Sequence, residues 1–466
     1  MPENDRRKGK NMVRIRLNDL KKFCKTALVK AGASEKDALT TAEVLSETEA
    51  WGTHSHGVKN LNNYIIKCEK GGASLTAQPT VVRESLSAAL VDAHQSLGMV
   101  SASYGMNLAI EKAEKTGIAI VNVTNSTHFG AAGYYSNMAA KRGMIGIAMS
   151  NVDPNMTLPG ARCQAIGNSP FSYAAPSEKV PSVFLDIAMS NVAGLKVVKA
   201  RNEGRTIPDT WIVDENGKPT TDPSIYPEKG ALLPVGMHKG YGLAVMVELL
   251  TGVLSGAPTS TSGKILSWCF APEIPNNVTH TFIAIDPRTI LGTGDIAEET
   301  EGFARLLRDV PRADGCDRIY TPGEIEWEKH AVSERDGVEI PDDVLAELAE
   351  AFDQAQRNSG LAFAERSRGN GGDFDELAVG LILQALHDLN EVDLRGLAVG
   401  DDLLGQQAEL FPEVVDGGKI LLRLFCDLPI LVDRRVERDV AGLRVYVLAV
   451  FEFDCHECIL LAGAGP

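Results

Sequence analysis

The stretch "GIAIVNVTNSTHFGAAGYYSNMAAKR" (residues 117–142) combines the patterns of a strand, a turn and a helix. Its β-branched run at 117–123 predicts a strand that is buried on both faces. The pattern from Tyr134 to Arg142 predicts a helix. His128 lies in the polar loop between them, and α/β folds usually carry their functional groups at such strand ends. The stretch therefore predicts an α/β fold with a candidate site at this loop.

The same patterns extend on both sides of this stretch. The runs "GMIGIAMSNV" (143–152) and "SVFLDIAM" (182–189) predict further buried strands, and residues 101–115 predict a helix. We therefore expect an α/β domain over residues 76–230.

Helical patterns precede and follow that domain. Residues 17–50 carry apolar residues at helical spacing, and Ser34 to Asp37 predicts a capping box that opens the second helix. After the domain, "KGYGLAVMVELLTGVLSG" (239–256) predicts a long helix, and residues 300–308 and 342–351 predict shorter ones. We expect a helical domain built from residues 13–75 and 231–355 around the inserted α/β domain.

The composition changes after about residue 360. Lys419 is the only lysine in the remaining segment, which lacks Met and Trp. The runs at 419–433 and 442–453 favour strands, and "CHEC" (455–458) lacks the second pair that a zinc site requires. Residues 356–466 are therefore expected to be an extension of unknown role. It is either a poorly folded segment, as an altered reading frame would produce, or an appended interaction module.

Composition excludes several classes of function. The 466 residues carry a net charge of −16 and have no basic block beyond the first fifteen residues, which argues against a nucleic-acid partner. No run of about 18 apolar residues predicts a membrane span, and the charged start lacks the apolar centre of a signal peptide. The eight cysteines are too scattered for a disulfide framework. We expect a cytoplasmic protein with reduced thiols.

The remaining candidate residues are histidines and charged groups in apolar surroundings. His54 and His56 in "WGTHSHG" (51–57) could ligate zinc, but no third ligand lies nearby, so a polar helix end is favoured and no metal is expected. His128 could be catalytic or structural. Asp186 lies within an apolar strand, where a carboxylate needs a physical reason, and Lys239 lies at a helix start.

Hydride transfer on a 2-hydroxy acid requires an acid/base group, and histidine suits that role because its pKa is near neutral. A Rossmann domain is not supported. The nearest approach to G-x-G-x-x-G is "GYGLAV" (240–245), which has Val245 at the third glycine and lies inside a predicted helix.

Residues 15–355 resemble the type-2 malate/L-lactate dehydrogenase family, whose members use NAD or NADP on a non-Rossmann fold. The motifs that carry the resemblance follow the family's order: "SHGV" (55–58), "KGG" (70–72), "THFGAAGYY" (127–135), "IGNSPFSYAAP" (166–176), "LDIAMS" (185–190), "IPDTWIVDENGKPTTDP" (207–223), "HKGYGLAVMVELLTGVL" (238–254) and "RIYTPGEIE" (318–326).

The resemblance implies a homodimer acting on a small molecule, with an active site between the helical and α/β domains. His128 and His56 would be the acid/base candidates, and Ser55, Lys59 and Asn60 would contact substrate. The residues that would line NAD or NADP are Val152, Asp186, Ile187, Ala188, Lys239, Gly323 and Glu324.

The chain departs from the family at two places. Many members carry an arginine before the "SHG" motif and another shortly after it, which holds the substrate carboxylate. Here those places read Trp51-Gly52 and Lys59-Asn60, and lysine does not replace the bidentate fork of arginine. The leading hypothesis is a dehydrogenase of 2-hydroxy acids. The alternative is a catalytically silent member that binds a dinucleotide or metabolite.

Overall fold

The computed structural model describes residues 13–292, 294–341, 344–351 and 355, together with five strands between residues 409 and 464. The chain divides into two compact units. The larger unit comprises Arg16–Val338 and Asp343–Phe363, and the smaller one comprises Met1–Ile15, Glu339–Asp342 and Ala364–Pro466.

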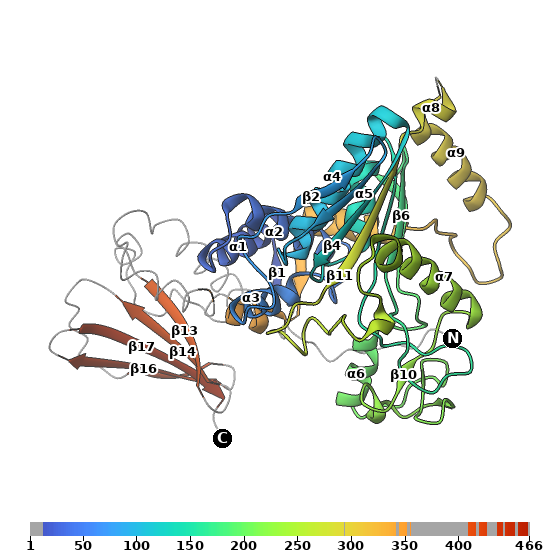
Figure 1. Ribbon diagram of the computed structural model, residues 1–466. Helices are drawn as coiled ribbons and strands as arrows, with labels where there is room; N and C mark the ends of the chain where they lie inside the picture. Colours follow the sequence, from blue (N-terminus) through green and yellow to red (C-terminus); the bar gives the residue numbers. More distant parts are fainter. Residues whose placement is uncertain are drawn as a thin grey trace. The chain divides into compact units, whose positions relative to one another are not determined.

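The larger unit is built on a seven-stranded sheet in the order β2-β3-β4-β11-β5-β6-β7 (Figure 1). Strands β3 and β4 run parallel, whereas every other neighbouring pair in this sheet runs antiparallel. A Rossmann sheet is mostly parallel, so this mixed α/β fold differs from it. The strands are β2 (Thr80–Glu84), β3 (Ala88–Asp92), β4 (Ile118–Ser126), β5 (Ile145–Ser150), β6 (Phe171–Pro176), β7 (Ser182–Ile187) and β11 (Val278–Ile285).

Strand β11 lies at the centre of the sheet, between β4 and β5. It comes from a part of the chain that its sequence assigned to the second helical segment, so the sheet extends beyond the expected boundary at residue 230. The reason is local: after its first residue, Val278, β11 continues with Thr279, His280 and Thr281, which are fully buried although they are polar. Because these three residues are polar, the sequence pattern does not indicate a strand that is buried on both faces.

Helices cover both faces of the sheet. The helices are α1 (Leu17–Lys30), α2 (Glu35–Ala50), α3 (Leu61–Glu69), α4 (Gly98–Thr116), α5 (Ala132–Ala140), α6 (Gly194–Asn202), α7 (His238–Glu248), α8 (Arg288–Leu291), α9 (Ile296–Arg308) and α10 (Glu324–Asp336). On one face, α4 packs so closely that a Cβ atom at Gly105 would lie 2.8 Å from the Phe282 ring. On the other face, the Thr281 hydroxyl donates to the Leu250 carbonyl at 2.8 Å. Phe282 and Thr281 are neighbours on β11 and therefore point to opposite faces.

The predicted helices form, with shifted ends. The expected helix at 239–256 begins at His238 and continues from α7 through a π-helical turn, η3 (Leu249–Val253). The helix expected from residue 300 begins at Ile296, where the Asp295 side chain accepts the Ala297 N–H. Residues 344–351 are helical.

Both ends of α2 follow from its sequence. The Ser34 hydroxyl accepts the Asp37 N–H at 3.1 Å, which confirms the predicted cap. At the other end Gly52 adopts a left-handed φ of 78°, and the N–H groups of Gly52 and Thr53 donate to the carbonyls of Glu49 and Thr48. This pair of bonds is a Schellman motif, which needs glycine at the left-handed position. It ends the helix and turns the chain toward His56.

Smaller sheets complete the two units. The larger unit also contains a three-stranded sheet of β10 (Ala231–Leu232), β8 (Ile212–Val213) and β9 (Pro219–Thr220). The smaller unit contains β1 (Val13–Ile15) and most of β12 (Val338–Ile340), which pair with each other. That unit also has an antiparallel sheet in the order β13-β14-β17-β16-β15, formed by Glu409–Val415, Lys419–Phe425, Cys455–Ala464, Leu443–Glu452 and Val436–Val440.

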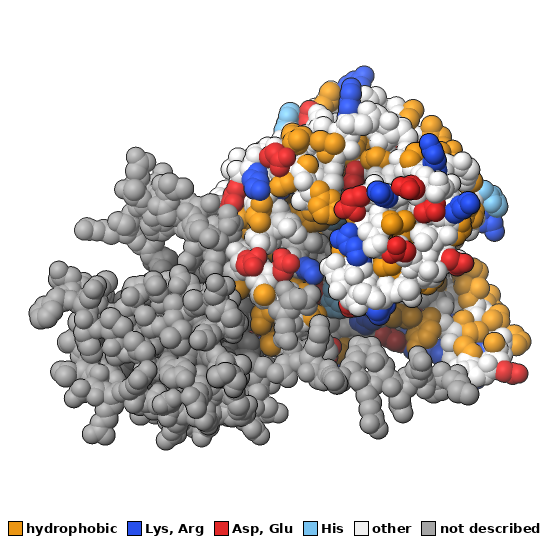
Figure 2. Space-filling view, turned by 90° about the horizontal axis from the view of Figure 1, so that it is seen from below, with side chains coloured by type: hydrophobic (Ala, Val, Ile, Leu, Met, Phe, Trp, Pro, Cys, Tyr) orange, Lys and Arg blue, Asp and Glu red, His pale blue; other side chains and the backbone are white. Residues whose placement is uncertain are grey.

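Within the described part of the chain, none of the helices is sufficiently long and apolar to cross a membrane. On the face shown in Figure 2, basic and acidic side chains of the described residues are interspersed, without a continuous basic patch.

Candidate functional site

The turn that follows α2 is organised by a buried carboxylate, Glu49. One of its oxygens accepts the Val58 N–H at 2.9 Å, and the other lies 2.5 Å from His54 Nδ1. Gly57 packs against the same carboxylate, because a Cβ atom there would lie 1.9 Å from Glu49 Oε2. Glu49 therefore holds the turn from both sides, and His54 is one of its structural partners, as expected of a polar residue at a helix end.

His56 lies within this turn, and its neighbours orient it. Its Nδ1 atom is 2.9 Å from the Ser55 hydroxyl. The Asn60 amide donates to the Ser55 carbonyl at 2.8 Å, so this amide group is engaged in holding the turn. Lys59 belongs to the short helix η1 (Val58–Asn60) and is half-buried. Ser55 therefore contacts His56, Asn60 holds the Ser55 carbonyl, and Lys59 lies in the short helix that follows.

His128 follows the end of β4, as its sequence predicts. The start of α4 packs directly against its backbone, because a Cβ atom at Gly98 would lie 2.3 Å from the His128 carbonyl oxygen. The Tyr64 hydroxyl of α3 lies 2.7 Å from His128 Nδ1. The rings of His56 and His128 stack with centroids 5.5 Å apart. Two segments far apart in the sequence therefore meet at a histidine pair.

A third histidine, His280, supports the segment that carries His128. His280 of β11 is fully buried between two hydroxyls, those of Ser150 at 2.9 Å and Ser126 at 2.8 Å. Its ring stacks on Phe129 with centroids 4.3 Å apart. Burial lowers the pKa of His280 to about 3. His280 is therefore a neutral structural residue that fixes the segment that carries His128.

Burial also controls the protonation of the pair. It lowers the pKa of His128 well below its ordinary value, and the positive charges that His56 and His280 would carry lower it further. Burial lowers the pKa of His56 as well, and it raises the pKa of Tyr64. Near neutral pH both rings are therefore uncharged and Tyr64 keeps its hydroxyl proton. A neutral imidazole can accept a proton, which is what a general base requires.

Asp186 links the histidine loop to strand β7. Helix α5 begins after Ala131, which has no side-chain acceptor, and the Asp186 carboxylate accepts the Gly133 N–H at 2.7 Å instead. A carboxylate at a helix start is stabilised by the helix dipole. Burial nevertheless raises the pKa of Asp186 to about 6, although the Gly133 bond opposes the shift. This bond gives a physical reason for a carboxylate within an apolar strand.

The other candidate cofactor residues converge beyond the end of β7, where Ile187 and Ala188 are half-buried. The Met189 carbonyl accepts the Val235 N–H at 2.9 Å and lies 2.7 Å from where a Cβ of Gly240 would be, so the start of α7 packs there. Lys239 is exposed at that helix start. Val152 packs against Gly167, and the next residue, Asn168, contributes a carbonyl that accepts the Met189 N–H at 2.8 Å.

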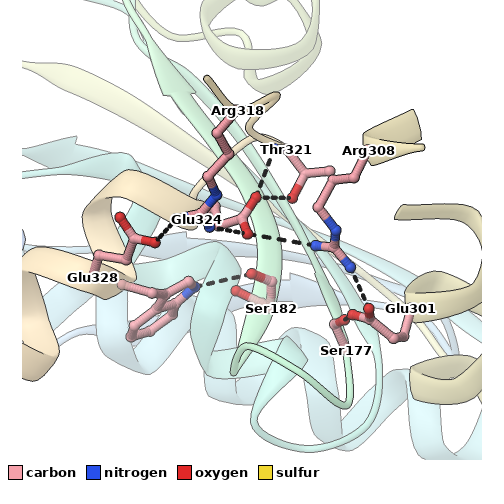
Figure 3. Close-up of polar contacts among 9 residues, drawn as sticks. Ser177, Ser182, Glu301, Arg308, Arg318, Thr321, Glu324 and Glu328 are labelled. Carbon is pink, nitrogen blue, oxygen red and sulfur yellow. Dashed lines mark hydrogen bonds and ion pairs between the residues drawn. The ribbon is translucent and has the colours of Figure 1, made fainter. Parts of the chain in front are cut away.

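Gly323 is the residue before α10, and Glu324 is the first residue of that helix. Figure 3 shows the polar contacts of the Glu324 side chain. The Phe184 N–H donates to the Pro322 carbonyl at 3.1 Å, and a Cβ atom at Gly323 would lie 2.4 Å from the Phe184 ring. The buried Glu324 carboxylate accepts the Thr321 N–H at 2.9 Å and pairs with Arg318 at 2.5 Å. The Glu324 side chain is therefore engaged within the protein.

The sequence analysis did not identify three residues of this site. Glu49 could have been found, because it lies in the apolar stripe of its helix, four residues after Leu45, and that position indicates burial. Tyr64 had no pattern to distinguish it from a core residue. Trp268 lies between η4 (Ser260–Ser262) and β11, and its indole stacks on both Tyr64 and His128. Only the folded chain brings it there.

Comparison with known proteins places the chain among hydroxy-acid dehydrogenases. A family model described as malate/L-lactate dehydrogenase matches residues 15–349. The malate dehydrogenase of Pyrococcus horikoshii is 36% identical over 347 residues, which cover 73% of this chain and 95% of that protein. The ureidoglycolate dehydrogenase (NAD(+)) of Escherichia coli K12 is 33% identical over 336 residues, 72% of this chain and 95% of that one. The crystal structure of malate dehydrogenase from Entamoeba histolytica superposes with a TM-score of 0.69 at 30% identity, covering 74% of this chain and 98% of that one.

These similarities define the class first: the larger unit has the fold of a hydroxy-acid dehydrogenase, an oxidoreductase. The chain belongs to the malate/L-lactate dehydrogenase family, which confirms the resemblance inferred from its motifs. The family model ends at residue 349, so residues 356–466 lie outside it.

Proposed function

We propose that this protein transfers a hydride between NAD or NADP and a small 2-hydroxy acid, with His128 as the acid/base group. The observation that carries the proposal is the Gly133–Asp186 bond, which joins the loop of His128 to the strand of candidate cofactor residues. In oxidation, the hydride leaves C2 for the dinucleotide and the hydroxyl proton passes to the imidazole. A 2-oxo acid remains, and the reverse direction returns both.

Tyr64 is suited to assist that proton transfer. A tyrosine hydroxyl can either donate or accept a hydrogen bond. In the tautomer required for oxidation, Nδ1 of His128 carries the proton and donates it to the Tyr64 oxygen, in place of the weak contact that Nδ1 accepts from the Gly130 N–H at 3.4 Å. Nε2 is then the nitrogen that takes the hydroxyl proton. His56, oriented by Ser55, would hold the substrate oxygen, and Lys59 would pair with the carboxylate. Asn60 would contribute by fixing the turn through the Ser55 carbonyl.

The residues beside β7 fit a dinucleotide. Helix α7 starts without a side-chain cap, and Lys239 is exposed at that start, which together suit a phosphate group. Val152, Ile187, Ala188 and Gly323 would supply small or apolar contact surface, whereas Asp186 and Glu324 would act mainly by shaping the site. A bound nicotinamide supplies or accepts the hydride.

The decisive experiment follows nicotinamide absorbance with NADH or NADPH and a panel of 2-oxo acids. We expect His128→Asn to lower kcat by roughly 10²- to 10⁴-fold, the usual contribution of general acid/base catalysis, with little change in dinucleotide affinity. His56→Asn should also lower kcat, and His54→Asn should change it less than about tenfold because a helix-end residue contributes about 0.5–2 kcal/mol to stability. Wild-type rates in both His128→Asn and His56→Asn would refute the acid/base assignment.

The alternative is a catalytically silent member that binds dinucleotide. Two observations favour it: Trp51-Gly52 and Lys59-Asn60 stand where many members have arginine, and the Asn60 amide is already engaged. Dinucleotide binding without turnover of any 2-oxo acid would select this alternative.

A homodimer and a cytoplasmic location complete the proposal. Large apolar side chains are exposed on α7 and its continuation, including Leu249 and Leu254, and on α9, including Phe303 and Leu306. Exposed apolar surface of this extent is typical of a protein interface. A second copy of the chain is its simplest occupant.

A further inference from the structure

Trp268 covers the histidine pair with a flat aromatic surface. Its indole lies nearly parallel to the His128 ring, with centroids 4.5 Å apart and an interplanar angle of 14°. It also stacks on Tyr64, with centroids 5.1 Å apart and an angle of 20°. Because Tyr64 and His128 are hydrogen-bonded to each other, the one indole contacts both partners of that bond.

Hydrogen bonds to main-chain carbonyls anchor the segment that carries Trp268. The buried Lys67 of α3 donates to the Ile274 carbonyl at 2.9 Å, and the Asn276 amide donates to the Leu266 carbonyl at 2.7 Å. These bonds span both sides of Trp268 in the sequence. They also commit the Lys67 ammonium group to main-chain oxygens, which leaves it unsuited to pair with a substrate anion.

The described side chains that contact the His128 ring, those of His56, Tyr64 and Trp268, carry no positive charge near neutral pH. Ser55, His56 and Tyr64 are uncharged near neutral pH. Lys59 is the only lysine or arginine between residues 51 and 66. One lysine can match one carboxylate, the group common to all 2-hydroxy acids. A second carboxylate, as in a dicarboxylic acid, would meet the indole, and a buried charge without a partner is strongly unfavourable.

We infer that Trp268 sets the substrate class of the reaction proposed above, favouring 2-oxo and 2-hydroxy acids with an uncharged, planar side chain over dicarboxylic ones. The inference rests on the proposed function. An aromatic substituent would pack on the exposed part of the indole, and offset aromatic pairs gain free energy beyond the burial of their area. Trp268 would thus act as a specificity residue beside the acid/base pair.

The test compares kcat/KM for phenylpyruvate, pyruvate and oxaloacetate in the full-length protein. We expect phenylpyruvate to be preferred over oxaloacetate, and Trp268→Ala to lower that preference about tenfold, the scale of one pocket contact. Trp268→Phe retains an aromatic face and should keep the preference within about threefold. Trp211→Phe is the matched control, because Trp211 is half-buried against a different core cluster.

A binding measurement accompanies the kinetics. The protein has four tryptophans, so the difference in fluorescence between wild type and Trp268→Phe isolates Trp268. Titration with 3-phenyllactate should change this difference saturably and at lower concentration than malate does. A preference that is unchanged in Trp268→Ala, or a fluorescence response that persists in Trp268→Phe, would overturn the inference while leaving the proposed function intact. Turnover of none of the 2-oxo acids would overturn both.

Discussion

Replacing Tyr64 by phenylalanine removes one hydroxyl from the centre of the site. The hydroxyl lies 2.7 Å from His128 Nδ1, whereas the ring stacks on Trp268. Phenylalanine keeps that stacking and the volume of the ring. The substitution therefore isolates the hydrogen bond to the imidazole from the packing around it.

The expected effect follows from the charge of His128 during the reaction. A hydrogen bond to a charged group contributes about 1.5–3 kcal/mol and one between neutral groups about 0.5–1.5 kcal/mol. Tyr64 therefore stabilises the imidazolium over the neutral ring by about 1–1.5 kcal/mol, which corresponds to a loss of kcat of roughly fivefold to tenfold in Tyr64→Phe. The stacking contribution to substrate affinity should remain, so KM should change little.

The pH dependence of kcat/KM gives a second, independent test of the Tyr64–His128 hydrogen bond. Oxidation requires neutral His128, so kcat/KM is full above the pKa of His128 and falls as the pH drops through it. Burial already holds that pKa well below its ordinary value. Losing the Tyr64 oxygen destabilises the imidazolium and lowers the pKa further, so the acidic limb should move to lower pH.

The assay is steady-state oxidation of a 2-hydroxy acid across pH, followed by nicotinamide absorbance. Tyr104→Phe is the matched control, because Tyr104 is an exposed tyrosine of α4, and it should leave both kcat and the limb unchanged. A Tyr64→Phe enzyme with wild-type kcat and an unmoved limb would contradict the role of the hydroxyl. A limb that moves to higher pH would show that the hydroxyl instead donates to neutral His128.

Three further perturbations test the surrounding structure. Gly57→Ala should lower the free energy of unfolding by about 1–3 kcal/mol, because the added Cβ atom would overlap the Glu49 carboxylate. Gly242→Ala is the control, because open space surrounds Gly242, and it should not lower the free energy of unfolding. Thermal unfolding compares the two variants. Truncation after Gly360 should preserve turnover and dimerisation and increase the soluble yield, and loss of either activity or dimer would show that the removed segment is integral. Leu306→Glu should shift the protein to monomer in light scattering, because it places a charge in the exposed apolar face of α9; an unchanged dimer would exclude that face.

Much of the fold was predictable where short-range physics dominates. The Ser34 cap depends on residues within one helical turn, and strand β4 opens with the apolar run 118–121. Strand β11 was not predictable, because its buried His280 is tolerated only where the hydroxyls of Ser150 and Ser126 on the two neighbouring strands bond to its ring. Local pattern cannot reveal such partners.

The candidate site divides in the same way. Both candidate histidines were identifiable without coordinates, His128 from its polar loop after an apolar run and His56 from the "SHGV" motif of the family that the chain resembles. Only the tertiary structure decided their surroundings. Tyr64 approaches His128, and Asp186 caps the helix that follows it, across 64 and 53 residues of chain. The physical reason is that hydrogen bonding, stacking and desolvation depend on distance in space, and the chain sets those distances only after its sheet has assembled.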